Sequence, residues 1–256
     1  MLVKTAIEER IGFVELNRPD KLNALSGELA KELIDVLDNM EKNDEVKVII
    51  LSGSGKSFSA GGDIDSMKHF SKANQTADWI TAMSKLTKKM VGLEKYIVAA
   101  VHGYAAGAGF SLALAADFIV AKKDAKFALS FKNLALIPDL GLIKLLSERL
   151  PPQIVKEWIL SGRIIDAKEA YEKMIINRMT DGSAVGEAIK FSQFIVDGPQ
   201  VSNKYVKFLV NNINDMSLDL ALMHENMIQT VLTDTGDFKE GLKAFSEKRK
   251  PKFVGN

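Results

Sequence analysis

The sequence predicts an α/β fold in which a β-β-α unit repeats and a helical region follows. Short apolar runs typical of strands alternate with amphipathic helical patterns in the first part of the chain. Two of these strands end in turns of small residues, and only helical patterns occur from Gly186 onward. We therefore expect a core over residues 1–195 and a helical appendage over residues 196–256.

The first strand-like runs are residues 2–10 and 11–17, and Gly12 is the expected hairpin turn between them. After the loop NRPDKLNAL, Ser26 is the expected N-cap of a helix. Its apolar residues recur at helical spacing and share one face: Leu29, Leu33, Val36, Leu37 and Met40. This face predicts that the helix packs on a sheet.

The next strand, Val46 to Leu51, leads into a glycine turn, and a polar helical pattern covers residues 64–92. Strand, small-residue turn and helix recur over residues 97–116, and FIVAK and KFALS follow as two short strands. The hydrophobic face expected in the 64–92 region consists of Trp79, Met83, Leu86 and Met90.

The remaining segments read as helices. LIKLLSERL stops at Pro151, QIVKEWILSG ends at Gly162, and Asp166 caps AKEAYEKM. The later patterns are EAIKFSQFIVDG, SNKYVKFLVNNIN, LDLALMHENMIQTVL and FKEGLKAFSEKRK. They indicate an appendage rather than a separate catalytic unit.

Composition excludes several classes of protein. A chain of 256 residues with 46% hydrophobic content can bury a core, and its net charge of +1 gives no field to attract nucleic acid or an anionic membrane. The chain has no cysteine, so disulfides and thiolate chemistry are excluded. The charged start MLVKTAIEER is unlike an export signal, so we expect a cytoplasmic protein.

Residues 96–116 carry no formal charge and are long enough to suggest a membrane span. His102 and three glycines interrupt this run, and Asp117 closes it before another β-rich segment. We therefore expect a buried strand that leads into a buried helix. His102 is expected to be a core histidine, and Asp117 is expected to cap a helix or form an ion pair.

Two turns of small residues offer main-chain N–H groups to a ligand. One lies in SFSAGGDIDSM, residues 57–67, and the other is GYAAGAG, residues 103–109. Because each follows a strand, their free amides could converge on one anionic oxygen, as an oxyanion hole requires. The alternative is that these glycines serve only tight turns and helix–strand packing.

Four motifs occur in a fixed order: NRPDKLNAL, SFSAGGDI, AAVHGYAAGAGFSLALAADFIVA and EGLKAFSEKRKPKF. In order and spacing they resemble the enoyl-CoA hydratase/isomerase family, also called the crotonase superfamily, over nearly the whole chain. The resemblance implies a crotonase-like β-β-α spiral core with a C-terminal helical oligomerisation region. It further implies a homotrimer or a hexamer built as a dimer of trimers.

The resemblance makes the N–H groups of Gly62 and Ala108 the pair that holds a thioester oxygen. It implies a coenzyme A thioester as substrate, with no tightly bound cofactor. The residues that it assigns to coenzyme A binding are Arg18, Lys21, Leu22, Ala60, Asp63, Ile64, Phe245 and Lys248. The last two would reach a nucleotide bound by a neighbouring subunit or by the same one. For the lysines, the alternative is a solvated loop and a charged tail.

Hydratases of this family use two glutamates, and the corresponding positions here are Ser111 and Phe131. Neither side chain is a general base at neutral pH. Asp139 falls where enoyl-CoA isomerases of the phenylacetyl-CoA epoxide isomerase type carry an acid. The expected apolar walls around it, which would raise its pKa, are Phe131, Leu136, Ile137 and Leu140. The alternative is that Asp139 only caps the helix LIKLLSERL.

Three hypotheses therefore remain open. The first is an acyl-CoA isomerase in which Asp139 moves the proton. The second is a hydratase or another crotonase-type lyase, and the third is a non-catalytic acyl-CoA binder. We expect no metal, because His69 and His224 lie in helical surface patterns without a second ligand nearby.

Overall fold

The computed structural model describes residues 1–68 and 73–256. Its larger sheet has six strands in the order β1-β2-β3-β4-β6-β9. β1 is antiparallel to β2, and every other neighbouring pair is parallel. The strands are β1 (Val3–Glu8), β2 (Ile11–Leu16), β3 (Val48–Gly53), β4 (Tyr96–Val101), β6 (Phe118–Lys122) and β9 (Arg178–Thr180).

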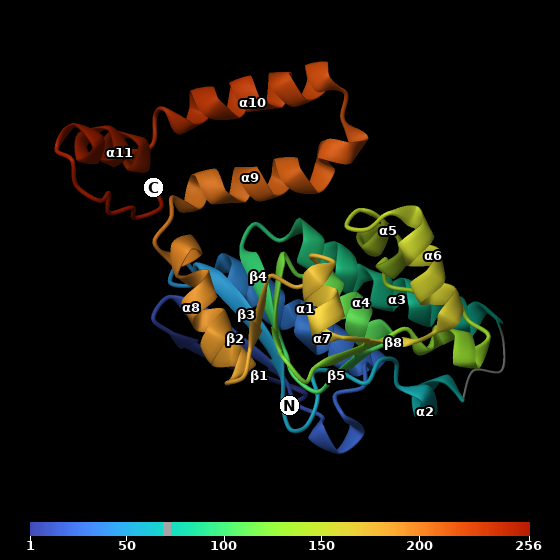
Figure 1. Cartoon of the computed structure of the whole chain (residues 1–256). Coiled ribbons are helices and arrows are strands. Elements are labelled where there is room, and N and C mark those ends of the chain that lie inside the picture. Colours follow the sequence, from blue (N-terminus) through green and yellow to red (C-terminus); the bar gives the residue numbers. More distant parts are fainter. Residues whose placement is uncertain (69–72) are drawn as a thin grey trace.

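Both faces of this sheet are covered, which explains why β3 and β4 read as nearly continuous apolar runs. On one face lie α1 (Gly27–Lys42), α3 (Ala73–Gly92) and α4 (Ala108–Leu114), whose apolar residues share the main core with the sheet. On the other face α8 (Ala184–Val196) packs through Ala184, Ala188 and Ile195 against β3, β4 and β6. Figure 1 shows the sheet between these helices.

The smaller sheet contains β5 (Tyr104–Ala106), β7 (Lys126–Ala128) and β8 (Ile164–Asp166). β5 and β7 are parallel, whereas β7 and β8 are antiparallel. β5, β8 and β9 were not expected from the sequence, because each has only three residues and no alternating pattern. β5 lies within residues 103–109, which were expected to form only a turn. The expected β-β-α succession is confirmed where β4 and β5 lead into α4.

The expected turn at Gly12 is wrong. Gly12 lies inside β2, and the hairpin turns at Glu9 and Arg10, whose φ angles are +49° and +67°. Two successive left-handed residues match the twist of a tight hairpin, although they are not the usual glycine or asparagine. Gly12 lies in a closely packed position instead, since a Cβ there would lie 2.9 Å from the Met40 sulfur and 3.0 Å from the Val46 Cγ1 atom.

The expected helix caps are confirmed at Ser26 and Asp166. Ser26 accepts a hydrogen bond from the Leu29 N–H, and Asp166 accepts one from the Glu169 N–H. The predicted face of α1 is buried except for the half-buried Val36.

Four further helices lie between the first glycine turn and β9. They are α2 (Ile64–Met67), α5 (Leu142–Ser147), α6 (Pro152–Ser161) and α7 (Ala167–Glu172).

The C-terminal helices α9 (Gln200–Asn212) and α10 (Leu218–Leu232) form a hairpin beside the core. α11 (Gly236–Ser246) follows, and Figure 1 places it at the opposite end of the molecule from α2. Asp237, at the start of α11, accepts hydrogen bonds from the N–H groups of Val254 and Gly255, which hold the tail against the helix. No helix in the described part of the chain is long and apolar enough to cross a membrane.

Candidate active site

The two small-residue turns lie side by side because the segments before them are hydrogen-bonded through their main chains. The Phe58 N–H donates to the His102 carbonyl at 2.9 Å, and the Ser59 N–H donates to the Tyr104 carbonyl at 3.0 Å. The Ser59 carbonyl accepts from the Ala106 N–H at 2.9 Å. This ladder fixes the two strand ends relative to each other before any ligand binds.

Gly62 and Ala108, the predicted oxyanion donors, stand on these two turns. Within residues 1–68 and 73–256, neither N–H group has a hydrogen-bond acceptor. The turns approach closely, because a Cβ on Gly61 would lie 3.5 Å from the Ala108 nitrogen. Gly61 also has φ +107°, a conformation that residues with side chains rarely adopt. Two adjacent free amides are what stabilisation of an oxyanion needs.

Asp139 lies in the loop between a 3-10 turn (Ser130–Leu134) and α5. The alternative of a helix cap is wrong, because the N-cap of α5 is Gly141 and no side chain caps it. The Asp139 Oδ1 atom is buried and has no hydrogen-bond partner in the described part of the chain. Burial raises the pKa of this carboxyl above its ordinary value. A raised pKa suits a group that must both take and return a proton.

Ser111 and Phe131 lie close to these elements. The Ser111 hydroxyl, fully buried in α4, is 3.1 Å from the Asp139 main-chain carbonyl oxygen. The Phe131 ring lies 3.8 Å from where a Cβ on Gly107 would be. The structure therefore brings a serine and a phenylalanine to the site, and neither can activate water as a base.

The four expected apolar walls differ in burial. Phe131 and Leu140 are buried, with 9% and 4% of their surface exposed. Leu136 and Ile137 follow the left-handed Ala135 and are 49% and 77% exposed in the single chain. That these four residues enclose the acid stays a prediction.

Thr87 of α3 was missed by the sequence reasoning. Its hydroxyl donates to the Leu140 carbonyl at 2.9 Å and therefore holds the loop that carries Asp139. A threonine among polar helical residues gives no sequence signal for such a contact, because the contact depends on how α3 packs against a distant loop.

The early loop and the first glycine turn, both assigned to coenzyme A, do lie together. The Ala60 N–H donates to the Leu22 carbonyl at 2.9 Å, and Leu22 and Ile64 are exposed beside it. Lys21 pairs with Asp65 at 2.7 Å, and together with Lys68 it lowers the pKa of that carboxyl to about 2. Lys21 stays more than half exposed, so a competing phosphate can reach it.

Arg18 and Asp63 hold this region rather than offering free charges. The Arg18 guanidinium lies 2.7 Å from the Asp63 carboxylate and also donates to the Ala24 carbonyl. Asp63 is mostly buried and caps α2 by accepting from the Asp65 N–H. Burial alone would raise the pKa of Asp63, but the Arg18 guanidinium and the N–H groups of Ser66 and Asp65 together outweigh it and hold this pKa below its usual range. Both side chains are therefore already partnered.

Phe245 and Lys248 are not brought to this site within one chain. Phe245 is 86% exposed on α11, and Lys248 follows the end of that helix. The early loop lies near α2, at the other end of the molecule from α11 (Figure 1). Both options, a nucleotide bound by a neighbouring subunit and one bound by the same chain, therefore stay predictions.

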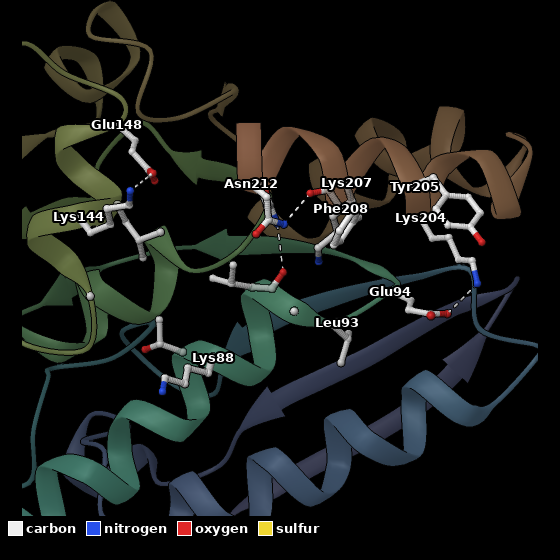
Figure 2. Close-up of a pocket in the computed structure, with 16 residues that line it drawn as sticks. Lys88, Leu93, Glu94, Lys144, Glu148, Lys204, Tyr205, Lys207, Phe208 and Asn212 are labelled. Atoms are coloured by element: carbon white, nitrogen blue, oxygen red, sulfur yellow. Dashed lines mark hydrogen bonds and ion pairs between the residues drawn. The ribbon is translucent and has the colours of Figure 1, made fainter. Parts of the chain in front are cut away.

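A cavity of about 630 Å³ lies beside the Asp139 loop, between α3, α5 and α9. Thr87 and Gly141 line it, whereas Gly62, Ala108 and Asp139 do not. Figure 2 shows two of its lysines in ion pairs, Lys144 with Glu148 at 3.0 Å and Lys204 with Glu94 at 3.4 Å. Lys88 and Lys207 also line the cavity.

The described residues contain no group of three or more His, Asp or Glu side chains that could hold a metal ion. His224 lies on α10, where its Nδ1 atom is 2.9 Å from the Leu220 carbonyl. His102 is half-buried, with Nε2 at 3.1 Å from the Gly55 carbonyl. His69 lies outside the described residues.

The spiral of β-β-α units and the helical C-terminus define a protein of the crotonase fold class. An enoyl-CoA hydratase from Bacillus anthracis has a crystal structure that superposes with a TM-score of 0.95 at 28% identity, and each chain covers 100% of the other. A structure of an enoyl-CoA hydratase from Polaromonas sp. JS666 gives a TM-score of 0.94 at 29% identity, covering 98% of this chain and 99% of that one.

The family profile described as enoyl-CoA hydratase/isomerase matches residues 6–256, so the chain belongs to that family. Among curated relatives, the 1,2-epoxyphenylacetyl-CoA isomerase of Escherichia coli is 29% identical, with 97% of each chain covered. The (E)-benzylidenesuccinyl-CoA hydratase of Thauera aromatica is also 29% identical, with 100% of each chain covered. Relatives of equal similarity thus carry isomerase and hydratase names, and the resemblance inferred from the motifs is confirmed.

Proposed function

We propose that the protein moves the double bond of a 3-enoyl-CoA to the 2 position, with Asp139 as the single acid and base. The observation that carries this proposal is the Oδ1 atom of the Asp139 carboxyl, which is buried and has no hydrogen-bond partner in the described part of the chain. The main-chain carbonyl of Asp139 is 3.1 Å from the Ser111 hydroxyl, in the helix that begins at Ala108. A carboxyl oxygen without a hydrogen-bond partner is available to substrate, and desolvation raises the proton affinity of the group.

In the proposed reaction the Asp139 carboxylate removes a proton from the carbon next to the thioester. The electron pair of that C–H bond moves toward the thioester oxygen and forms a dienolate, whose charge the Gly62 and Ala108 N–H groups stabilise. The protonated Asp139 then returns the proton to the gamma carbon, and the double bond ends between the alpha and beta carbons. Atoms and charge balance, and no water is consumed.

The residues at the two hydratase glutamate positions support isomerisation over hydration. Hydration needs a group that activates water and a group that delivers a proton, and Ser111 and Phe131 are not titratable at neutral pH. A hydratase remains the second candidate, because the Thauera aromatica relative that aligns over the full length is named as one.

An Asp139→Asn variant tests the proposal against both alternatives. We expect it to lose 3-enoyl-CoA isomerisation while coenzyme A binding, measured by calorimetry, persists. Asp124→Asn is the matched control, because the Asp124 side chain is 71% exposed. Rapid hydration of crotonyl-CoA by the wild type would establish the hydratase instead. Binding without turnover of either substrate would establish a non-catalytic binder.

We further propose that residues 196–256 assemble the protein into a homotrimer or a dimer of trimers. α9, α10 and α11 expose large apolar side chains that a monomer would leave in water. Sedimentation should therefore give three or six times the chain mass of 28.1 kDa. Examples of these exposed residues are Val210, Leu218, Met227, Leu242 and Phe245.

A further inference from the structure

The loop that carries Asp139 has an unfavourable backbone conformation. Leu140 has φ +51°, in the left-handed region that is uncommon for a leucine, and Gly141 follows with φ +78°. Leu140 is also buried, with 4% of its surface exposed, so it cannot relax by moving into solvent. A conformation of this kind persists only where surrounding groups hold it.

Two hydroxyl groups from different helices hold consecutive carbonyls of this loop. Thr87 of α3 donates to the Leu140 carbonyl at 2.9 Å, and Ser111 of α4 lies 3.1 Å from the Asp139 carbonyl. The Leu142 N–H also donates to the Asp139 carbonyl at 3.1 Å. The two hydroxyls thus connect the loop to α3 and α4, whereas the Leu142 contact is local.

The position of the carboxyl depends on these main-chain contacts. The buried Oδ1 atom of Asp139 has no hydrogen-bond partner in the described part of the chain, so no hydrogen bond to that atom fixes the side chain. Ser111 stands one turn after Ala108 in α4, so the helix that carries one proposed oxyanion donor also contacts the loop that carries the acid.

We propose that Thr87 and Ser111 are positioning residues that fix the Asp139 loop relative to the N-terminus of α4. They set where the acid stands with respect to the thioester, and they take no part in proton transfer. This role rests on the proposed isomerase function. A small displacement of a catalytic group is costly, because proton transfer requires close and aligned atoms.

The test compares Thr87→Val and Ser111→Ala with two controls. Thr87→Val keeps the shape and removes the donor, whereas Thr87→Ser keeps the donor. Ser192→Ala is the matched control for Ser111→Ala, because Ser192 is also fully buried in a helix and donates to the Ala188 carbonyl, but it lies in α8. All four variants are measured for isomerisation and for amide hydrogen exchange in peptides that contain Leu142.

We expect Thr87→Val and Ser111→Ala to lower kcat about tenfold with KM changed less than about twofold, since binding groups are untouched while the acid moves. Exchange of the Leu142 amide should rise in both. Thr87→Ser should have a higher kcat and slower exchange of the Leu142 amide than Thr87→Val, because it keeps the donor. Ser192→Ala should match the wild type in both measurements.

Unchanged Leu142 exchange in both variants would overturn the proposal, and so would an unchanged kcat. An equal loss of kcat in Ser192→Ala would overturn it too, because the effect would then be general destabilisation. The Asp139→Asn variant distinguishes a failure of the proposed function from a failure of the positioning role of Thr87 and Ser111. If that variant keeps isomerase activity, the proposed function fails; if it loses activity while Thr87→Val and Ser111→Ala keep theirs, only the positioning role fails.

Discussion

The Lys207 ammonium of α9 lies 2.8 Å from the Asp117 carboxylate, which follows α4. Both side chains are almost fully buried, and the same carboxylate oxygen accepts a hydrogen bond from the Ile97 N–H at 2.7 Å. Lys207 also donates to the Lys95 carbonyl at 3.0 Å. The pair fits the expectation that Asp117 caps or pairs, and it joins the C-terminal helices to the core.

Replacing Lys207 with methionine should destabilise the protein by about 3–5 kcal/mol, because Asp117 would remain buried without a counter-charge. Urea unfolding at a fixed protein concentration measures this loss. Lys204→Met on the same helix is the control, and its half-exposed pair with Glu94 should be worth at most about 1 kcal/mol. Adding Asp117→Asn should restore part of the stability, since Asn still accepts from Ile97; no recovery would contradict this account.

The partly buried carboxyl of Asp139 should lower the free energy of unfolding at neutral pH. Burial raises its folded-state pKa above the unfolded value, so the folded protein binds more protons between the two pKa values. The contribution of Asp139 to the free energy of unfolding is therefore fully present below its pKa in the unfolded chain, about 3.9. This contribution is lost as the pH rises through the pKa of Asp139 in the folded protein. Asp139→Asn should raise Tm at pH 7, and the gain should shrink toward pH 4. A gain in Tm that does not vary with pH would show that ionisation of Asp139 is not its cause.

The raised pKa of Asp139 should also appear in the pH dependence of kcat/KM. In the proposed reaction Asp139 must be ionised to remove the first proton, so kcat/KM for isomerisation should rise with pH through the pKa of the free enzyme. Because burial raises that pKa, the midpoint should lie above the value of about 3.9 for an ordinary aspartate. Initial rates in buffers of constant ionic strength measure the midpoint. A midpoint at or below the ordinary value would show that another group controls the rate.

The sequence predicted features that depend on local chemistry. The small-residue turns and the Ser26 and Asp166 caps each have a signature within a few neighbouring residues. The role of Asp139 came from the family resemblance and stays a prediction. Contacts that depend on packing had no such signature. The hydroxyl of Thr87, the exposure of Ile137 and the turn at Glu9 follow from how distant elements meet, which one sequence does not encode locally.

Gly109 should be essential for the approach of α4 to the first turn. A Cβ there would lie 2.5 Å from the Ser59 carbonyl oxygen, a main-chain atom that cannot move aside cheaply. Gly109→Ala should therefore destabilise the protein by about 1–3 kcal/mol and lower kcat. Gly92→Ala at the end of α3 is the control, because a Cβ there meets nothing within 4 Å. Equal Tm and kcat for the two variants would contradict the packing argument.

The Ala108 N–H can be removed without changing the side-chain chemistry of the site. Ala108 is the first residue of α4, where proline is tolerated because the N–H has no partner within the helix. If this N–H stabilises the dienolate, Ala108→Pro should lower kcat by about 10²–10³-fold.

A second proline variant separates the lost donor from the strain of the ring. Ala184 is likewise the first residue of its helix and is almost fully buried, but it lies in α8 on the other face of the sheet. Ala184→Pro should therefore keep kcat, whatever its effect on Tm. Coenzyme A affinity should persist in Ala108→Pro, because the missing contact strengthens only as charge develops on the thioester oxygen. Retained kcat in Ala108→Pro would remove Ala108 from the proposed oxyanion pair and leave Gly62 as the sole main-chain donor proposed.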